Sequence, residues 1–325
     1  MKKIIFTGFL LITGTSTQCV TFPECWMEMR REYKRLVAEF CEEPTFNRQA
    51  FYHPFWEKTT DSIKRFILGP PRSGLLQHPA LTSTMVRGSS GGGLNAGQYH
   101  ELCYLKYCVS PETDCLIRKF TEPTFGNLAI TCAEYGCSTN SLGQLYYAAR
   151  ILEKIKNSEK IRTIVEVGGG FGNLAYIFKN MLPDATLVLF DLPELLVIQY
   201  LYLSLALPDV SVTIHHDVSA PIQTAGVHLV PIFLLPEAHV KADVFVSNFA
   251  LSEATTEVQQ AVIDRNFFDA SLCYITGQLN GAREEFVNQK LIHEAVRRAY
   301  DGVDCLPFHL FYPGECEPYE LIGTR

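Results

Sequence analysis

The sequence predicts an α/β fold in which a doubly wound, mainly parallel sheet follows a mainly helical N-terminal region. Three observations lead to this prediction. A β-branched segment runs into a cluster of glycines near residue 168, a second apolar segment ends in a carboxylate at residue 191, and strand-like and helical segments alternate from there toward the C terminus. Such alternation is typical of a parallel sheet, because each parallel crossover needs a helix-length connection.

Residues 164–175 have the layout of a strand, a tight turn and a helix start. β-branched residues and Glu166 precede the turn, and an apolar pattern suited to a helix follows it. Three glycines in the turn would let a nucleotide-like ligand approach the backbone. The cofactor-binding candidates in this segment are Glu166, Gly168, Gly170 and Gly172. The segment therefore predicts a ligand site at the carboxyl end of the first strand.

A carboxylate lies at the end of the next predicted strand. Residues 187–191 form a short apolar run that ends at Asp191, 19 residues after Gly172. An acid at this place can hold both hydroxyls of a ribose. A dinucleotide-binding fold would fit too, but its fingerprint usually reads Gly-x-Gly-x-x-Gly. This chain reads Glu-x-Gly-x-Gly-x-Gly, which resembles the first motif of S-adenosylmethionine-dependent methyltransferases and implies S-adenosylmethionine as the cofactor.

The remaining elements of the predicted sheet follow in regular order. A helix over 142–156 precedes the first strand. After Asp191 we expect helices at 194–205, 255–268 and 283–300, and strands at 210–214, 244–247, 272–276, 306–312 and 319–322. A turn at Pro313 and Gly314 would join the last two of the seven strands. The resemblance implies the seven-stranded, Rossmann-like methyltransferase sheet, in which such a hairpin places the antiparallel last strand.

The N-terminal part of the chain has a different character. Apolar residues recur at helical spacing over 23–68 and again over 98–120. Between 69 and 97 the chain is rich in glycine, proline and serine, which predicts a linker or a mobile loop over an active site. We therefore predict a substrate or cap region at 18–140, with this glycine-rich loop, and a cofactor-binding catalytic domain at 141–325.

Composition limits the classes of partner. A net charge of −7 argues against a nucleic-acid partner, which normally meets a basic surface. No apolar stretch reaches the roughly 18 residues of a membrane span. Eleven cysteines without a Cys-x-x-Cys pair argue against a structural metal site. We expect a small-molecule or glycan substrate; the oligomeric state stays undetermined.

The first residues leave the compartment open. Residues 1–17 combine a basic start, a short apolar core and small residues, as a secretory signal peptide or an N-terminal anchor does. S-adenosylmethionine is made in the cytosol, and this cofactor supply favours a cytoplasmic protein. Both alternatives remain.

Four segments resemble the sugar O-methyltransferase family. They are 122–127, 145–150, 165–175 and 247–253. The chain departs from the family pattern at Leu128, where a proline is usual, and at Phe171 and Phe249, where tyrosines are usual. The resemblance implies methyl transfer to a hydroxyl of a sugar or glycan precursor. Another small hydroxylated metabolite as acceptor, or a non-catalytic binding protein with the same fold, are the alternatives.

A second resemblance, to plant-type and antibiotic small-molecule O-methyltransferases, rests on 167–170 and 190–193. Those enzymes use a histidine base after the fourth strand, where this chain has Ser252 and Glu253. Their mechanism therefore cannot be carried over.

The catalytic candidates are carboxylate and imidazole groups near strand ends. Glu253 is the first candidate for the general base, because a sugar hydroxyl is weakly acidic and needs one; a helix-stabilising carboxylate is the alternative. His216 is the second candidate. Asp217 is predicted to contact the adenine, since residues after the third strand do so in this fold. Asn248 is predicted to line the cofactor's methyl site.

Overall fold

The computed structural model describes residues 21–42, 47–71, 74–82, 94–126, 128–155, 161–222, 225–278, 289–308 and 318–325. The predicted signal peptide, residues 72–73 and 83–93 of the glycine-rich loop, and the turn at Pro313 and Gly314 lie outside these residues. No helix in the described part of the chain is long and apolar enough to cross a membrane.

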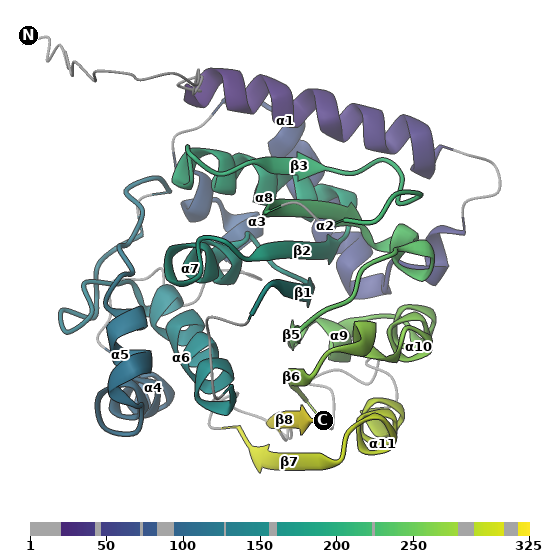
Figure 1. Cartoon of the computed structure of the whole chain (residues 1–325). Helices are drawn as coiled ribbons and strands as arrows, with labels where there is room; N and C mark the ends of the chain where they lie inside the picture. Colours follow the sequence, from purple (N-terminus) through teal and green to yellow (C-terminus); the bar gives the residue numbers. More distant parts are fainter. Residues whose placement is uncertain are drawn as a thin grey trace, which may run out of the picture.

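A single eight-stranded sheet forms the centre of the molecule (Figure 1), with the order β3-β4-β2-β1-β5-β6-β8-β7. The strands are β1 (Thr163–Val167), β2 (Thr186–Asp191), β3 (Val212–Ile214), β4 (Gly226–Pro231), β5 (Val244–Asn248), β6 (Leu272–Gln278), β7 (Gly302–Pro307) and β8 (Pro318–Thr324). The first six strands in this order, β3-β4-β2-β1-β5-β6, pair in parallel. β8 lies between β6 and β7 and is antiparallel to both. The α/β prediction and the antiparallel C-terminal hairpin are confirmed.

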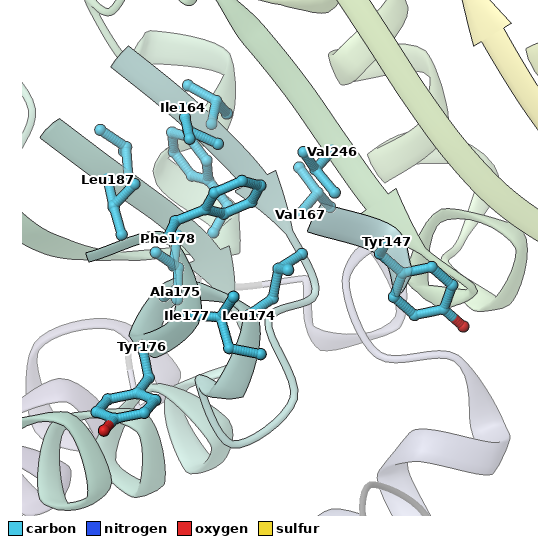
Figure 2. Packing of buried hydrophobic residues seen from close by; sticks show 14 of the residues in the cluster. Tyr147, Ile164, Val167, Leu174, Ala175, Tyr176, Ile177, Phe178, Leu187 and Val246 are labelled. Carbon is cyan, nitrogen blue, oxygen red and sulfur yellow. The ribbon is translucent and has the colours of Figure 1, made fainter. Parts of the chain in front are cut away.

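Helices from the C-terminal part of the chain cover both faces of the sheet. They are α6 (Thr139–Lys154), α7 (Asn173–Met181), α8 (Pro193–Ala206), α9 (Ala250–Glu253), α10 (Thr256–Asp264) and α11 (Gln289–Ala299), with short turns at η5 (Ile232–Glu237) and η6 (Asn266–Asp269). β2, β4 and β6 are buried along their whole length, as expected when helices cover both faces of a sheet. Figure 2 shows the ring of Phe178 of α7 beside Ile164 and Leu187 of the sheet.

The sheet has one strand more than predicted. β4 lies in a segment that reads as a proline- and valine-rich loop in the sequence, and it pairs with β2 along its full length. The predicted third strand, 210–214, is β3, and it is displaced to the edge beyond β4. Non-local pairing decides which strand lies beside β2, and hydrophobic patterning cannot show it.

Two other predicted bounds need correction. The helix expected over 255–268 ends at Asp264, and residues 266–269 then take left-handed backbone angles. The strand expected over 306–312 begins earlier, at Gly302, and its last residues, like the first residues of the helix predicted over 283–300, lie outside the described part of the chain.

The N-terminal region is mainly helical, as predicted. It contains α1 (Phe22–Leu36), α2 (Pro54–Leu68), α3 (Pro79–Thr82), α4 (Ala96–Tyr107) and α5 (Pro111–Ile117), with turns η1 (Val37–Cys41), η2 (Arg48–Ala50) and η3 (Leu75–Gln77). Figure 1 shows α1 beside the β3 edge of the sheet, and α4 and α5 near α6. α1 and α2 both contact α8, and one hydrophobic core runs through this region and the sheet. The division into two domains stays a prediction.

Candidate functional site

A cavity of about 280 Å³ lies at the carboxyl ends of β1, β2 and β5; we call it the larger cavity. Its floor is formed by Glu166, the glycine turn 168–170 and Asp191. Asn248, Phe249 and Glu253 line it from the end of β5 and from α9. This is where an open parallel sheet binds ligands, because loops from adjacent strands separate there.

The glycine turn is required by backbone geometry and by close packing. Gly168 and Gly170 have φ angles of 80° and 58°, in the left-handed region that favours glycine. A Cβ atom on Gly168 would lie 1.9 Å from the Cβ atom of Ala250. The turn therefore lets α9 approach the end of β1 and leaves backbone exposed to the cavity.

Two buried carboxyl groups face this cavity. Asp191 accepts hydrogen bonds from the backbone N–H of Leu192 (2.8 Å) and from Nε2 of Gln199 (2.7 Å). Burial raises the pKa of Asp191 to about 7 despite these bonds. Burial, with the neighbouring charge of Asp191, raises the pKa of Glu166 to about 8, and no hydrogen bond to the Glu166 carboxyl group is found among the described residues. Glu166 is thus prepared for a ligand group that donates hydrogen bonds or carries positive charge.

Ser247 fixes the end of β5, and the next residue after the strand, Phe249, has strained backbone angles. Ser247 Oγ donates to the carbonyl oxygen of Val167 (3.0 Å) and accepts from the N–H of Leu251 (3.0 Å), which joins β1, β5 and α9. Phe249 has a φ angle of 61°, uncommon for a bulky residue. Such strain is often found at functional sites. Asn248 Oδ1 accepts from Thr276 (3.3 Å), and its buried Nδ2 has no partner within the described part of the chain.

The structure places two predicted residues away from the cavity. His216 contacts Glu39 (Nδ1 to Oε2, 2.5 Å) and Glu32 (Nε2 to Oε2, 2.8 Å), so it joins the sheet edge to α1 and η1. Asp217 is exposed and accepts from Ser219 (2.7 Å). Neither lines the larger cavity. Asp217 follows β3 at the sheet edge, whereas η5 follows β4, the strand that pairs with β2; the adenine contact of Asp217 stays a prediction.

Several cavity residues were missed in the sequence. Gln199 orients Asp191 from α8, and its Nε2 also donates to the Gly170 carbonyl oxygen (3.0 Å). Trp56 of α2 and Tyr147 of α6 form aromatic walls of the larger cavity. The helical periodicity of these residues indicated packing only. Contact with the cavity depends on how α2, α6 and α8 are placed around the sheet, which no local motif encodes.

Comparison with known proteins agrees with this geometry. Residues 138–225 match an O-methyltransferase domain, and the matched segment includes the glycine turn, Asp191 and Gln199. The protein is an S-adenosylmethionine-dependent methyltransferase. Comparison with curated proteins gives no significant match. The matched segment gives no acceptor for this methyltransferase, so the sugar remains a prediction.

Three solved structures similar to the methyltransferase are a Thermoplasma acidophilum protein, the mitomycin 7-O-methyltransferase and an O-methyltransferase family protein from Burkholderia thailandensis. The first has 14% identity and a TM-score of 0.39, covering 66% of this chain and 97% of the other. The second has 14% identity and a TM-score of 0.33, covering 57% of each chain. The third has 14% identity and a TM-score of 0.37, covering 57% and 60%.

The residues present fit the cofactor. Asp191 would accept from its hydroxyl groups, because a carboxylate offers about four lone pairs and Asp191 accepts bonds from Leu192, Gln199 and the Gly169 backbone. Glu166, whose carboxyl group has no hydrogen bond among the described residues, would hold its ammonium group, and the backbone at Gly168 and Gly170 would hold its amino-acid chain. The buried Nδ2 of Asn248 offers one further donor at the cavity wall.

Proposed function

We propose that this methyltransferase methylates a hydroxyl oxygen of a small hydroxylated metabolite, with Glu253 as the general base. The match to an O-methyltransferase domain supports oxygen as the methyl acceptor. A sugar hydroxyl, which the family resemblance implies, is one acceptor within this class. The single observation that carries the proposal is the position of Glu253. Its carboxylate lies at the end of α9, just after β5, and lines the larger cavity.

The chain's own residues would bind and orient the acceptor. Trp56, Tyr147 and Phe249 provide aromatic walls that exclude water, and amide side chains such as Gln144 can hold hydroxyl groups. When bound, S-adenosylmethionine supplies an electrophilic methyl group. Positioning then supplies much of the rate, because the acceptor oxygen must be aligned for in-line displacement.

Proton removal is assigned to Glu253. Glu253 lines the larger cavity from α9, and no histidine is among the described residues that line this cavity. The carboxylate of Glu253 would take the hydroxyl proton as the oxygen becomes methylated, which is general-base catalysis. Asn248 is the last residue of β5 and lines the larger cavity. Its amide group would help to orient the reacting groups.

The first test is transfer of labelled methyl groups from S-adenosylmethionine to a panel of phenols, sugars and aliphatic alcohols. We expect labelled product with at least one hydroxyl acceptor. Thermal shifts with S-adenosylmethionine, S-adenosylhomocysteine and NAD should accompany it, with stabilisation by the first two only. Failure of both to stabilise the protein would contradict the proposal.

The second test replaces the base. We expect Glu253→Gln to lower kcat by about 10² or more, the usual contribution of a general base, while the Kd for S-adenosylhomocysteine stays unchanged. Glu257→Gln is the matched control, because Glu257 is exposed on α10 and does not line the larger cavity. Unchanged turnover of the Glu253 variant would refute its role as base and leave O-methylation to be judged by the acceptor panel.

A further inference from the structure

A short hairpin before α6 brings two cysteines together. Cys132 and Cys137 form an isolated antiparallel bridge, in which the N–H of each residue donates to the carbonyl oxygen of the other (2.9 and 3.0 Å). Residues 133–136 form the turn between them, and Gly136 at its end has a φ angle of 58°. The backbone therefore holds the two cysteines directly opposite each other.

The two side chains also meet. Both cysteines carry free thiols that are hydrogen-bonded to each other, and both residues are buried. Opposite residues that exchange both backbone hydrogen bonds have Cα atoms about 5.5 Å apart. Disulfide bonds usually join cysteines whose Cα atoms are about 4.4–6.8 Å apart. The bridge thus places Cys132 and Cys137 within the range of a disulfide.

A second pair of cysteines has the same spacing in the sequence but a different geometry. Cys103 and Cys108 are also five positions apart, and they lie in α4 and at its C-terminal cap. A helix rises about 1.5 Å per residue, so these two residues are about 7.5 Å apart along the axis. Cysteines more than about 7 Å apart cannot be bridged without movement of the backbone. The hairpin, and not the spacing, makes Cys132 and Cys137 a suitable pair.

We propose that Cys132 and Cys137 are a disulfide site that is oxidised while the chain folds. The oxidant is a low-molecular-weight disulfide such as oxidised glutathione. The thiolate of one cysteine attacks it, forms a mixed disulfide and releases one thiol; the thiolate of the other cysteine then displaces the second thiol. The two cysteines lose two electrons and two protons, which the two released thiols take up.

Burial decides when this bond forms. Burial, with the nearby Cys132 and Glu122, raises the pKa of the Cys137 thiol in the folded protein. Because the thiolate is the reactive form, the folded dithiol reacts slowly. In the unfolded chain both thiols are accessible, and the short loop between them closes at a small entropic cost. Oxidation therefore belongs to folding, and burial then shields the finished bond from reductants.

The bond would fix the segment that leads into α6. Ser138 follows Cys137 directly and caps α6 by accepting from the N–H of Ser141 (3.1 Å), while its own N–H donates to Glu122 (2.8 Å). Ser141 Oγ accepts from Asn173 (3.0 Å), which lines the larger cavity. The disulfide therefore lies beside contacts that reach the cavity, and it stabilises them without adding a residue to the site.

Peptide mapping tests the bond. The full chain is unfolded with reductant, refolded in reduced and oxidised glutathione, and then alkylated in denaturant. Cys132 and Cys137 lie in one tryptic peptide, residues 120–150, and cleavage after Glu134 divides this peptide between them. We expect its two halves to stay joined until reduction, and Cys103 and Cys108 to be alkylated.

The opposite pattern would overturn the proposal. Alkylation of both Cys132 and Cys137 in the refolded protein would do so, as would a bond from either of them to another cysteine. The same map of the full chain produced in the oxidising bacterial periplasm provides the measurement if refolding yields too little protein.

Melting temperatures test the effect of the bond. We expect the oxidised wild-type protein to melt about 2–5 °C above the reduced protein, because a disulfide restrains the unfolded chain. Cys132→Ala should melt at the same temperature in both conditions. Cys103→Ala is the matched control and should keep the wild-type difference. A difference that persists in Cys132→Ala would overturn the proposal, since another pair of cysteines would then cause it.

Discussion

The floor and the roof of the candidate cofactor site are built in different ways. The floor consists of backbone in left-handed conformation, packed so closely at Gly168 that no side chain fits. The roof consists of aromatic side chains from the N-terminal region that line a smaller adjoining cavity, namely Phe51, His53 and Trp56. It is attached through the hydrogen bond of Tyr52 to Glu194 (2.9 Å) and that of Thr255 to the Ala50 carbonyl oxygen (2.6 Å). The floor therefore tolerates no side chain at Gly168, whereas the roof depends on side-chain contacts that can be removed one at a time.

The largest expected effect breaks the floor. Gly168→Ala would force a Cβ atom against Ala250 at a φ angle of 80°. Left-handed strain and overpacking together should lower the free energy of unfolding by about 3–5 kcal/mol. Gly136→Ala is the matched control, since Gly136 has a φ angle of 58° but no atom within 4 Å of the added Cβ, and it should lose only about 1–2 kcal/mol. Equal losses in denaturant unfolding would show that close packing at Gly168 contributes nothing.

A second prediction concerns the charge on the floor. Because burial raises the pKa values of Glu166 and Asp191, the folded protein keeps protons that the unfolded chain has lost above its carboxyl pKa values. This contribution to stability is complete at low pH and is lost as the pH rises toward 8. We expect the unfolding free energy to fall between pH 5 and pH 8, by about 1.4 kcal/mol per pH unit for each retained proton.

Glu166→Gln separates this effect from other titrating groups. Denaturant unfolding of the variant should show a smaller fall with pH than the wild-type protein, whereas Glu257→Gln, at an exposed position, should keep the wild-type fall. An unchanged pH dependence in Glu166→Gln would mean that the Glu166 carboxyl group is solvated in the folded protein.

A smaller effect is expected where the roof is attached. Burial raises the pKa of Glu194, whose carboxyl group accepts from Tyr52 at 2.9 Å and from Tyr33 at 3.3 Å. Tyr52→Phe removes the shorter bond and should cost about 1–2 kcal/mol of stability. Tyr33→Phe is the natural comparison and should cost less. If Tyr33→Phe proves the more destabilising variant in denaturant unfolding, α1 rather than the roof segment is the main partner of Glu194.

The smallest effect is expected at the edge of the sheet. His216→Gln replaces the contacts to Glu32 and Glu39, which lie partly exposed between the β3 edge and α1. We expect a loss of stability of about 1 kcal/mol or less and unchanged methyl transfer, measured side by side with Glu253→Gln. A large fall in turnover without a change in stability would restore His216 as a catalytic residue.

Local stereochemistry made part of this site readable in the sequence. A left-handed turn needs glycine, so Gly168, Gly170 and Gly172 mark the turn directly. In a parallel sheet, the carboxyl ends of all strands lie at the edge where ligands bind. Asp191 is the last residue of β2, so its carboxylate lies at this edge whatever the strand order. Ser138 caps α6 by accepting from the N–H of Ser141, again a signal carried within four residues.

The sequence by itself determined the α/β class, the glycine turn, Asp191 and the antiparallel hairpin, because each is specified by residues close together in the chain. The tertiary structure alone decided that β4 rather than β3 lies beside β2, that His216 and Asp217 lie outside the larger cavity, and that Trp56 reaches both cavities. Strand order and helix docking depend on burial of apolar surface between distant segments. Periodicity shows which residues are buried, but it does not show against what they pack.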